Sequence, residues 1–206
     1  MLTIVDYGVG NLASMQNMLK KIGVPSKITS ERKDLEEADR LILPGVGAFD
    51  TCAEKLQQSG LIETLTYQVM IKQVPVLGVC VGMQLLLEGS EEGMLPGLGW
   101  IEGHNVKFRQ DQLPERTKIP HMGWTDVVPR KVSGLLNGLE QESRFYFVHS
   151  YHALLTNEQD VLLHANYGYS FTAGLERGNI VGVQFHPEKS HKFGMKLLKN
   201  FATFYS

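Results

Sequence analysis

The residues with the clearest chemistry are one cysteine and one histidine–glutamate pair that lie far apart in the chain. Cys80 lies in the segment GVCVG, between an apolar run and a stretch with helical character. His186 and Glu188 lie two positions apart in the segment FHPEK. A thiol, an imidazole and a carboxylate can serve as a nucleophile, a base and the group that orients the base. We therefore predict that these three residues meet in the folded chain and attack a carbonyl carbon.

The sequence around Cys80 predicts a sharp turn from a strand into a helix. The apolar run Val74–Val79 is typical of a buried strand, and Met83–Glu88 is typical of a helix. Gly78 and Gly82 flank Cys80 at positions where side chains would collide with a tight backbone. This is the pattern of a nucleophile elbow, which holds its reactive atom above the sheet.

A helix that begins just after Cys80 would favour the reactive form of the thiol. Unpaired N–H groups and the partial positive charge at a helix N-terminus stabilise the thiolate, which is the nucleophile. The N–H of Val81 would also point toward the oxyanion that forms during the attack. An isolated cysteine is more often a small buried apolar residue, and this is our interpretation of Cys52. For Cys80, the flanking glycines and the distant HPE sequence favour catalysis.

The HPE sequence follows the run Asn179–Phe185, which predicts a strand. Residues two apart in an extended segment point to the same side, so Glu188 can hold the tautomer of His186. Pro187 fixes its own backbone and restricts His186 to extended conformations. The alternative is a structural histidine at a strand end. The chain has seven histidines, and the HPE sequence is the reason to select His186.

Several motifs carry a resemblance to a known family. PGVGAF from Pro44, GVCVGMQLL around Cys80 and FHPEKS from Phe185 resemble the triad-type class I glutamine amidotransferases. DYGVGNL, HMGW and FYFVHSYH resemble one branch, the glutaminase subunits of imidazole glycerol phosphate synthases. The resemblance implies that the chain hydrolyses glutamine and passes on ammonia for the synthesis of imidazole glycerol phosphate and AICAR in histidine biosynthesis. The alternatives are the pyridoxal phosphate or anthranilate branch and, more distantly, a cysteine peptidase or related hydrolase.

The PGVG segment has no side chain for acid–base chemistry, so its value would lie in its backbone. The resemblance implies that it is the oxyanion strand, in which the N–H of Val46, next to Gly47, joins that of Val81 after a peptide flip. A glycine-rich turn without a catalytic role is the alternative. The resemblance also implies contacts with bound glutamine, largely through backbone groups in the HSY segment, from Gly45, Gln84, His149, Ser150 and Tyr151.

Nothing in this chain looks able to consume ammonia, so we expect a separate partner. The resemblance implies a heterodimer with a (β/α)8-barrel cyclase subunit that receives ammonia through a protected channel. Trp124 is the strongest signal, because tryptophan combines a large apolar area with a polar group and is enriched at interfaces. A core tryptophan is the alternative. The interface residues implied by the resemblance are Asn11, Met122, Trp124, Tyr146 and Lys189.

Two weaker patterns would suit a cofactor or a metal. GVGNLA, from Gly8, matches a dinucleotide-binding pattern, with Glu31 further along the chain. A nicotinamide enzyme would, however, have no use for a thiolate elbow and an HPE sequence. His149 and His152 have a spacing that suits a metal ion, but a pair without a third ligand is weak evidence. We expect no cofactor and no metal.

Composition predicts one globular domain over residues 1–206. Hydrophobic residues make up 43% of the chain and charged residues 20%, and a net charge of −2 gives no reason to expect nucleic acid. The N-terminal sequence turns polar too early for a signal peptide, and no apolar run is long enough to span a membrane. Two cysteines argue against a disulfide framework, so we expect a reducing cytoplasm.

Strands and helices alternate in the first half, which predicts an α/β fold with an open, mostly parallel or mixed sheet flanked by helices. The second half predicts additional antiparallel strands. We expect the site at the carboxyl ends of the parallel strands. The predicted strands are Leu2–Asp6, Ser26–Thr29, Leu41–Leu43, Val74–Val79, Val106–Phe108, Thr125–Val128, Arg144–Val148, Val161–His164, Phe171–Glu176 and Asn179–Phe185, and the predicted helices are Asn11–Lys21, Thr51–Gln58, Leu61–Ile71, Met83–Glu88 and Phe193–Tyr205.

Overall fold

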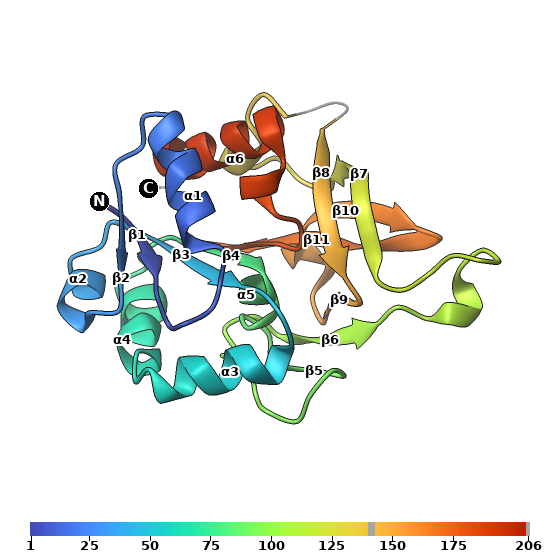
Figure 1. Ribbon diagram of the computed structural model, residues 1–206, viewed down its shortest axis with the longest axis horizontal. Coiled ribbons are helices and arrows are strands. Elements are labelled where there is room, and N and C mark those ends of the chain that lie inside the picture. Colours follow the sequence, from blue (N-terminus) through green and yellow to red (C-terminus); the bar gives the residue numbers. More distant parts are fainter. Residues whose placement is uncertain (140–142, 205–206) are drawn as a thin grey trace.

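The computed structural model describes residues 1–139 and 143–204, and its centre is a sheet whose first half is parallel (Figure 1). These strands are buried along most of their length, as expected where helices cover both faces. Gly45 pairs with Cys80 at the carboxyl ends of two neighbouring strands. The parallel strands lie in the order β2 (Ser26–Thr29), β1 (Leu2–Val5), β3 (Arg40–Gly45), β4 (Val76–Cys80) and β12 (Ile180–Val183).

Helices cover the two faces of the parallel half (Figure 1). One face carries α1 (Leu12–Lys21) and α6 (His191–Phe204), which contact each other. The opposite face carries α3 (Phe49–Gln58) and α4 (Ile62–Thr66), and α4 continues as a π-helical turn over Tyr67–Ile71. The short α2 (Arg32–Glu36) packs against α4, and the single turn α5 (Val81–Gln84) follows β4 directly.

Beyond β12 the sheet continues with antiparallel strands, in the order β11 (Tyr169–Arg177), β10 (Val161–Tyr167), β7 (His121–Pro129) and β8 (Arg144–His149). A side branch starts at β11, which also pairs with β9 (Tyr151–Leu155). β9 pairs in turn with β6 (Gly103–Lys107), and β6 pairs with the short β5 (Gly89–Ser90). The β8–β9 connection therefore joins the last strand of one arm to the first strand of the other, and residue 150 is at its turn.

The predicted α/β fold class is confirmed, including the parallel first half and the antiparallel strands of the second half. The strand Ser26–Thr29 has the predicted bounds, and most other predicted strands differ by a few residues at their ends. The helix predicted to end at Tyr205 is α6, and that end lies outside the described residues. In the part of the chain that the structure describes, no helix is both long enough and apolar enough to span a membrane.

The helix predicted over Met83–Glu88 is wrong in length and position, because α5 covers only Val81–Gln84. The segment that follows is buried and uses its carbonyl groups for contacts outside a helix. The N–H groups of Leu98, Gly99 and Ile101 donate to the carbonyl oxygens of residues 85, 87 and 86, at 2.7, 3.1 and 3.0 Å. These bonds replace the helical ones, so the helix stops after one turn.

The strand β9 was not predicted, although Tyr151 and His152 were considered as ligand contacts. Its residues pair with β6 and β11, which lie far away in the sequence, so no local pattern marks them. The single helix predicted over Leu61–Ile71 consists of α4 and the π-helical turn. Gly60 separates α3 from α4 as expected, and its backbone has a left-handed φ of 68°.

Candidate active site

The backbone of Cys80 forms the predicted nucleophile elbow. Cys80 ends β4 and precedes α5, with φ 56° and ψ −114°. A positive φ is uncommon outside glycine and stores strain, typically at functional sites. A Cβ on Gly82 would lie 1.9 Å from the carbonyl oxygen of Leu43, and one on Gly45 would lie 2.4 Å from the Gly82 nitrogen. The elbow therefore packs against β3 so closely that only glycine fits at these two positions.

The imidazole of His186 interacts with both Cys80 and Glu188. Its Nδ1 atom lies 2.9 Å from Glu188 Oε1, and both side chains are 2% exposed. Burial by itself lowers the pKa of His186, but hydrogen bonds with Cys80 and Glu188 outweigh burial and raise this pKa to about 9. His186 thus carries a proton at neutral pH.

The backbone of His186 is held by β8 and by a short turn. Its N–H donates to the Tyr146 carbonyl at 2.9 Å, and its carbonyl accepts from the Ser190 hydroxyl at 2.6 Å. The extended tripeptide predicted here is wrong in part, because Pro187–Lys189 forms a 3₁₀ turn after an extended His186. The turn still brings Glu188 to the imidazole, so the predicted contact is present with a different backbone.

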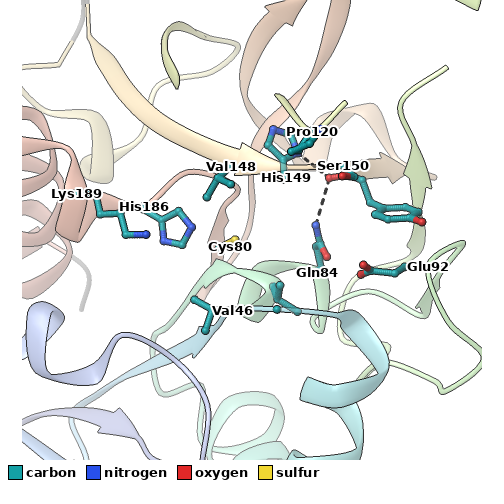
Figure 2. A pocket seen from close by; sticks show the side chains of 13 residues that line it. Val46, Cys80, Gln84, Glu92, Pro120, Val148, His149, Ser150, His186 and Lys189 are labelled. Carbon is teal, nitrogen blue, oxygen red and sulfur yellow. Dashed lines mark hydrogen bonds between the residues drawn. The ribbon is translucent and has the colours of Figure 1, made fainter. Parts of the chain in front are cut away.

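A pocket of about 340 Å³ opens over Cys80 (Figure 2). This volume suits a small molecule. Glu92, Pro120 and Val148 line the pocket without any signal from the sequence motifs. The other lining residues are all predicted site residues, namely Val46, Gly47, Cys80, Val81, Gln84, His149, Ser150, Tyr151, His186 and Lys189.

The Tyr151 carbonyl oxygen joins the HSY segment to the elbow. Gln84 Nε2 donates to it at 3.2 Å, and His149 Nδ1 donates to it at 2.7 Å, as the dashed lines in Figure 2 show. Gln84 Nε2 also donates to Gln184 Oε1 at 3.1 Å. The side chain of Gln84 is 3% exposed and fixed at its nitrogen end. The segment predicted to hold glutamine is thus tied to the helix that follows the nucleophile.

The first residue of the HSY segment, His149, forms a buried pair with His121. His121 Nδ1 is 3.0 Å from His149 Nε2, and His121 Nε2 is 2.8 Å from the hydroxyl of Thr125. Because His149 Nδ1 faces a carbonyl, it carries the proton, and its Nε2 accepts from His121. Burial lowers the pKa of His121 to about 4 and that of His149 well below its usual value. Both rings are therefore neutral at neutral pH.

Two side chains hold the PGVG segment from behind. The hydroxyl of Tyr7 donates to the Pro44 carbonyl at 2.5 Å, and the thiol of Cys52 donates to the Val46 carbonyl at 3.3 Å. Burial raises the pKa of the Cys52 thiol, which keeps the proton needed for this bond. The carbonyl groups on either side of the Gly45–Val46 peptide are thus fixed. Cys52 is completely buried, which agrees with its interpretation as a packing residue.

The residues predicted at a partner interface lie at the surface. Met122 is 62% exposed and Trp124 is 42% exposed, two positions apart on β7. The Trp124 ring stacks on His191, and Lys189 Nζ lies over the ring of Tyr146 at 5.9 Å. Asn11 is half-buried and precedes α1, which contacts the turn Pro187–Lys189.

Gln184 is a buried polar residue at the site that the sequence analysis did not select. Its side chain is completely buried, and its Nε2 atom lies 3.9 Å from the sulfur of Cys80. A glutamine within the apolar run Asn179–Phe185 was a signal that could have found it. The GVGNLA segment, in contrast, has a structural contact: a Cβ on Gly10 would lie 2.9 Å from the Pro44 side chain.

Within residues 1–139 and 143–204, no three histidine, cysteine, aspartate or glutamate side chains are grouped so that they could hold a metal ion. His149 and His152 lie in the same aromatic cluster around Phe108. His149 uses both ring nitrogens for hydrogen bonds within the protein. It therefore has no nitrogen left for a metal.

Comparisons with known proteins agree with the geometry. The family model "Glutamine amidotransferase class-I" matches residues 3–203. Imidazole glycerol phosphate synthase subunit HisH 2 from Pseudomonas aeruginosa is 54% identical over 202 residues, which cover 98% of each chain. Subunit HisH from Bdellovibrio bacteriovorus is 48% identical over 202 residues, with 98% and 99% covered.

Solved structures of lower identity share the fold. PurLQS from Thermotoga maritima matches with a TM-score of 0.74 at 16% identity, over 100% of this chain and 98% of that chain. The glutaminase domain of CTPS from Trypanosoma brucei matches with a TM-score of 0.65 at 16% identity, over 98% and 93%.

Proposed function

Because this chain belongs to the class I glutamine amidotransferase family, we propose that its pocket hydrolyses glutamine to glutamate and ammonia. Its HisH relatives at about half identity over the full length assign it to the glutaminase subunits of imidazole glycerol phosphate synthase. The ammonia then serves the synthesis of imidazole glycerol phosphate and AICAR in histidine biosynthesis. The observation that carries the proposal is the His186 imidazole, which lies 2.9 Å from Glu188 and lines one pocket with Gln84 and the strained Cys80.

In the first half of the proposed reaction, the Cys80 thiolate attacks the side-chain amide carbon of glutamine. A C–S bond forms, and the amide oxygen becomes an oxyanion that the N–H groups of Val81 and Val46 stabilise. His186 then gives its proton to the nitrogen. The C–N bond breaks, ammonia leaves, and a glutamyl thioester remains on Cys80.

In the second half, water hydrolyses the thioester. Neutral His186 takes a proton from the water as it attacks the thioester carbon, and the C–S bond then breaks. Glutamate leaves, and the imidazolium–thiolate pair is restored. Glu188 holds the imidazole through Nδ1 in both halves.

The pocket also offers groups for the amino-acid end of glutamine. The carboxylate of Glu92 lines the pocket, and it would attract an α-ammonium group. Ser150 and Tyr151 line the same pocket at the turn between β8 and β9. We propose that these residues, with Gly45, Gln84 and His149, select glutamine over amides that lack the α-amino and α-carboxylate groups.

The partner subunit of the synthase is proposed to be a (β/α)8-barrel cyclase that forms a heterodimer with this chain in the cytoplasm. The exposed Met122 and Trp124 support an interface near the mouth of the pocket, with Tyr146 and Lys189 beside His186. A contact there would cover the place where ammonia leaves. A protected channel would keep ammonia from protonation in water before it reacts.

The test is a Cys80→Ala variant in complex with the cyclase. It should lose glutamine-dependent synthesis, because no covalent intermediate can form, and keep synthesis driven by added ammonia. Loss of both activities would refute the division of labour between the two chains. A glutamine analogue that alkylates thiols should label Cys80 rather than Cys52, and peptide mapping reads this out. Labelling of Cys52 instead would contradict the assignment of the nucleophile.

A further inference from the structure

Gln184 lies directly beneath the nucleophile, and its contacts determine which of its side-chain atoms faces the sulfur. The Tyr151 carbonyl oxygen can only accept hydrogen bonds. Gln84 approaches this oxygen at 3.2 Å with one end of its amide, so that end is the –NH2 group. The same –NH2 group lies 3.1 Å from the Gln184 side chain, which must therefore present its oxygen. The Gln184 nitrogen is then the atom that faces Cys80 Sγ, at 3.9 Å.

The orientation of both amides is thus fixed by one backbone carbonyl. A flipped Gln184 would place two –NH2 groups against each other and an oxygen against the sulfur of Cys80. Gln184 is completely buried, so water would not relieve either clash. The Gln84 amide is oriented in the same way. Its nitrogen makes both contacts within the protein, so its oxygen is the atom that remains for a ligand in the pocket.

We propose that Gln184 is a further catalytic residue, whose amide N–H donates to the Cys80 sulfur and whose oxygen holds the Gln84 amide with its oxygen toward the substrate. The inference rests on the proposed glutaminase function. An N–H donor stabilises a thiolate more than a thiol, and such contacts are often long in the free enzyme and tighten during the reaction. The oxygen of Gln84 can accept from an α-ammonium group, whereas its –NH2 group would oppose one. Gln184 therefore acts on reactivity and on recognition through its two ends.

The test compares the variants Gln184→Met and Gln84→Met. Methionine has about the side-chain length of glutamine but has no amide group. Iodoacetamide reports the reactivity of the Cys80 sulfur without any need for the amino-acid end of glutamine. Gln184→Met should slow this alkylation and lower kcat by about tenfold, and it should raise the KM for glutamine about fivefold. Gln84→Met should raise the KM but leave alkylation within about twofold of the native rate.

Equal alkylation rates in the native protein and Gln184→Met would overturn the inference, and so would an equal slowing in both variants. A merely structural role would not separate the two rates in this way. A native far-ultraviolet circular dichroism spectrum and thermal melt of each variant verify that it folds. Glutamine hydrolysis by the native complex is measured in parallel, because its absence would refute the proposed function rather than the role of Gln184.

A measurement on the native protein covers the case in which Gln184→Met does not fold. The side-chain amide resonances of Gln184 should shift in the nitrogen–proton NMR spectrum when Cys80 is alkylated, because the acceptor is lost. Gln58 is a control, since its amide donates to Glu54 on the surface of α3. A Gln184 signal that moves no more than that of Gln58 would overturn the inference.

Discussion

The buried pair His121 and His149 should make the chain unstable in mild acid. Both rings are neutral in the folded protein, and each has one ring N–H. That of His121 donates to His149, and that of His149 donates to the Tyr151 carbonyl, while the second nitrogen of His121 faces the hydroxyl of Thr125. Protonation of His121 would put a donor toward Thr125 and a charge among the rings of Phe147 and Tyr167. Burial, which disfavours that charge, is what lowers the pKa of His121 to about 4.

The size of the effect follows from the difference between the folded and unfolded states. An unfolded histidine has a pKa near 6.5, so below that pH the unfolded chain binds a proton that the folded chain refuses. The stability is therefore complete above pH 6.5 and is lost as the pH falls toward 4, at about 1.4 kcal/mol per pH unit. For His121 the total is up to about 3 kcal/mol. His149 adds to this loss, because its pKa is also lowered by burial.

The assay is urea unfolding of the native chain and of His121→Phe between pH 7.5 and pH 4.5. Phenylalanine keeps an aromatic ring next to Phe147 and Tyr167 but cannot bind a proton. At pH 7.5 the variant should be less stable by about 1–2 kcal/mol, because His149 Nε2 loses its donor. Between pH 6.5 and pH 4.5 the variant should lose about 2 kcal/mol less than the native chain.

Carboxylates contribute to acid sensitivity as well, but they do so equally in both proteins. The pKa of Asp126, for example, is lowered by its hydrogen bond with Arg144. The difference between the two curves therefore isolates His121. Parallel curves for the native chain and His121→Phe would refute the reasoning.

Three other predictions follow from the site. Glutaminase activity should decline above about pH 9, because His186 then loses the proton that it gives to the departing nitrogen of glutamine. The stability that protonated His186 contributes to the fold is complete below pH 6.5 and is lost as the pH rises through about 9. An activity that continues to rise to pH 10.5 would contradict this. Gly82→Ala should abolish glutamine hydrolysis and lower the melting temperature, since its Cβ would clash with the carbonyl of Leu43, and native melting behaviour would disprove the clash. Trp124→Ala should weaken cyclase binding about thirtyfold in calorimetry, whereas Val128→Ala, exposed on the same strand, should change it less than twofold; equal effects would place the interface elsewhere.

The side chains of the proposed triad could be placed together from the sequence because each depends on a local pattern. Cys80 follows an apolar run and lies between glycines, and the close contact of Gly82 with Leu43 explains why those glycines are needed. His186 and Glu188 follow a second apolar run, and parallel pairing of β12 with β4 brings the ends of the two runs together. The carboxyl ends of neighbouring parallel strands meet at one edge, so the sequence was sufficient to place these groups together.

The elements that the sequence did not predict depend on contacts between distant segments. The short α5 ends where residues 98–101 take the carbonyl groups of the residues after Gln84, and no helix signal in Met83–Glu88 could reveal those donors. β9 exists because β6 and β11 pair with it. Gln184 escaped selection as a site residue for a related reason, since its contact with Cys80 is visible only in the folded chain.

The hydrogen bonds from His121 to His149 and from His149 to the Tyr151 carbonyl depend on the strand register. His121 lies opposite His149 in the β7–β8 pair, so the buried face of β7 donates toward the HSY segment. Met122 and Trp124 lie on the other face of the same strand and are exposed. A shift of β7 by one residue would exchange the two faces, exposing the histidine and burying the tryptophan. The proposed interface and the support of the proposed glutamine-binding turn therefore depend on the same register of β7 against β8.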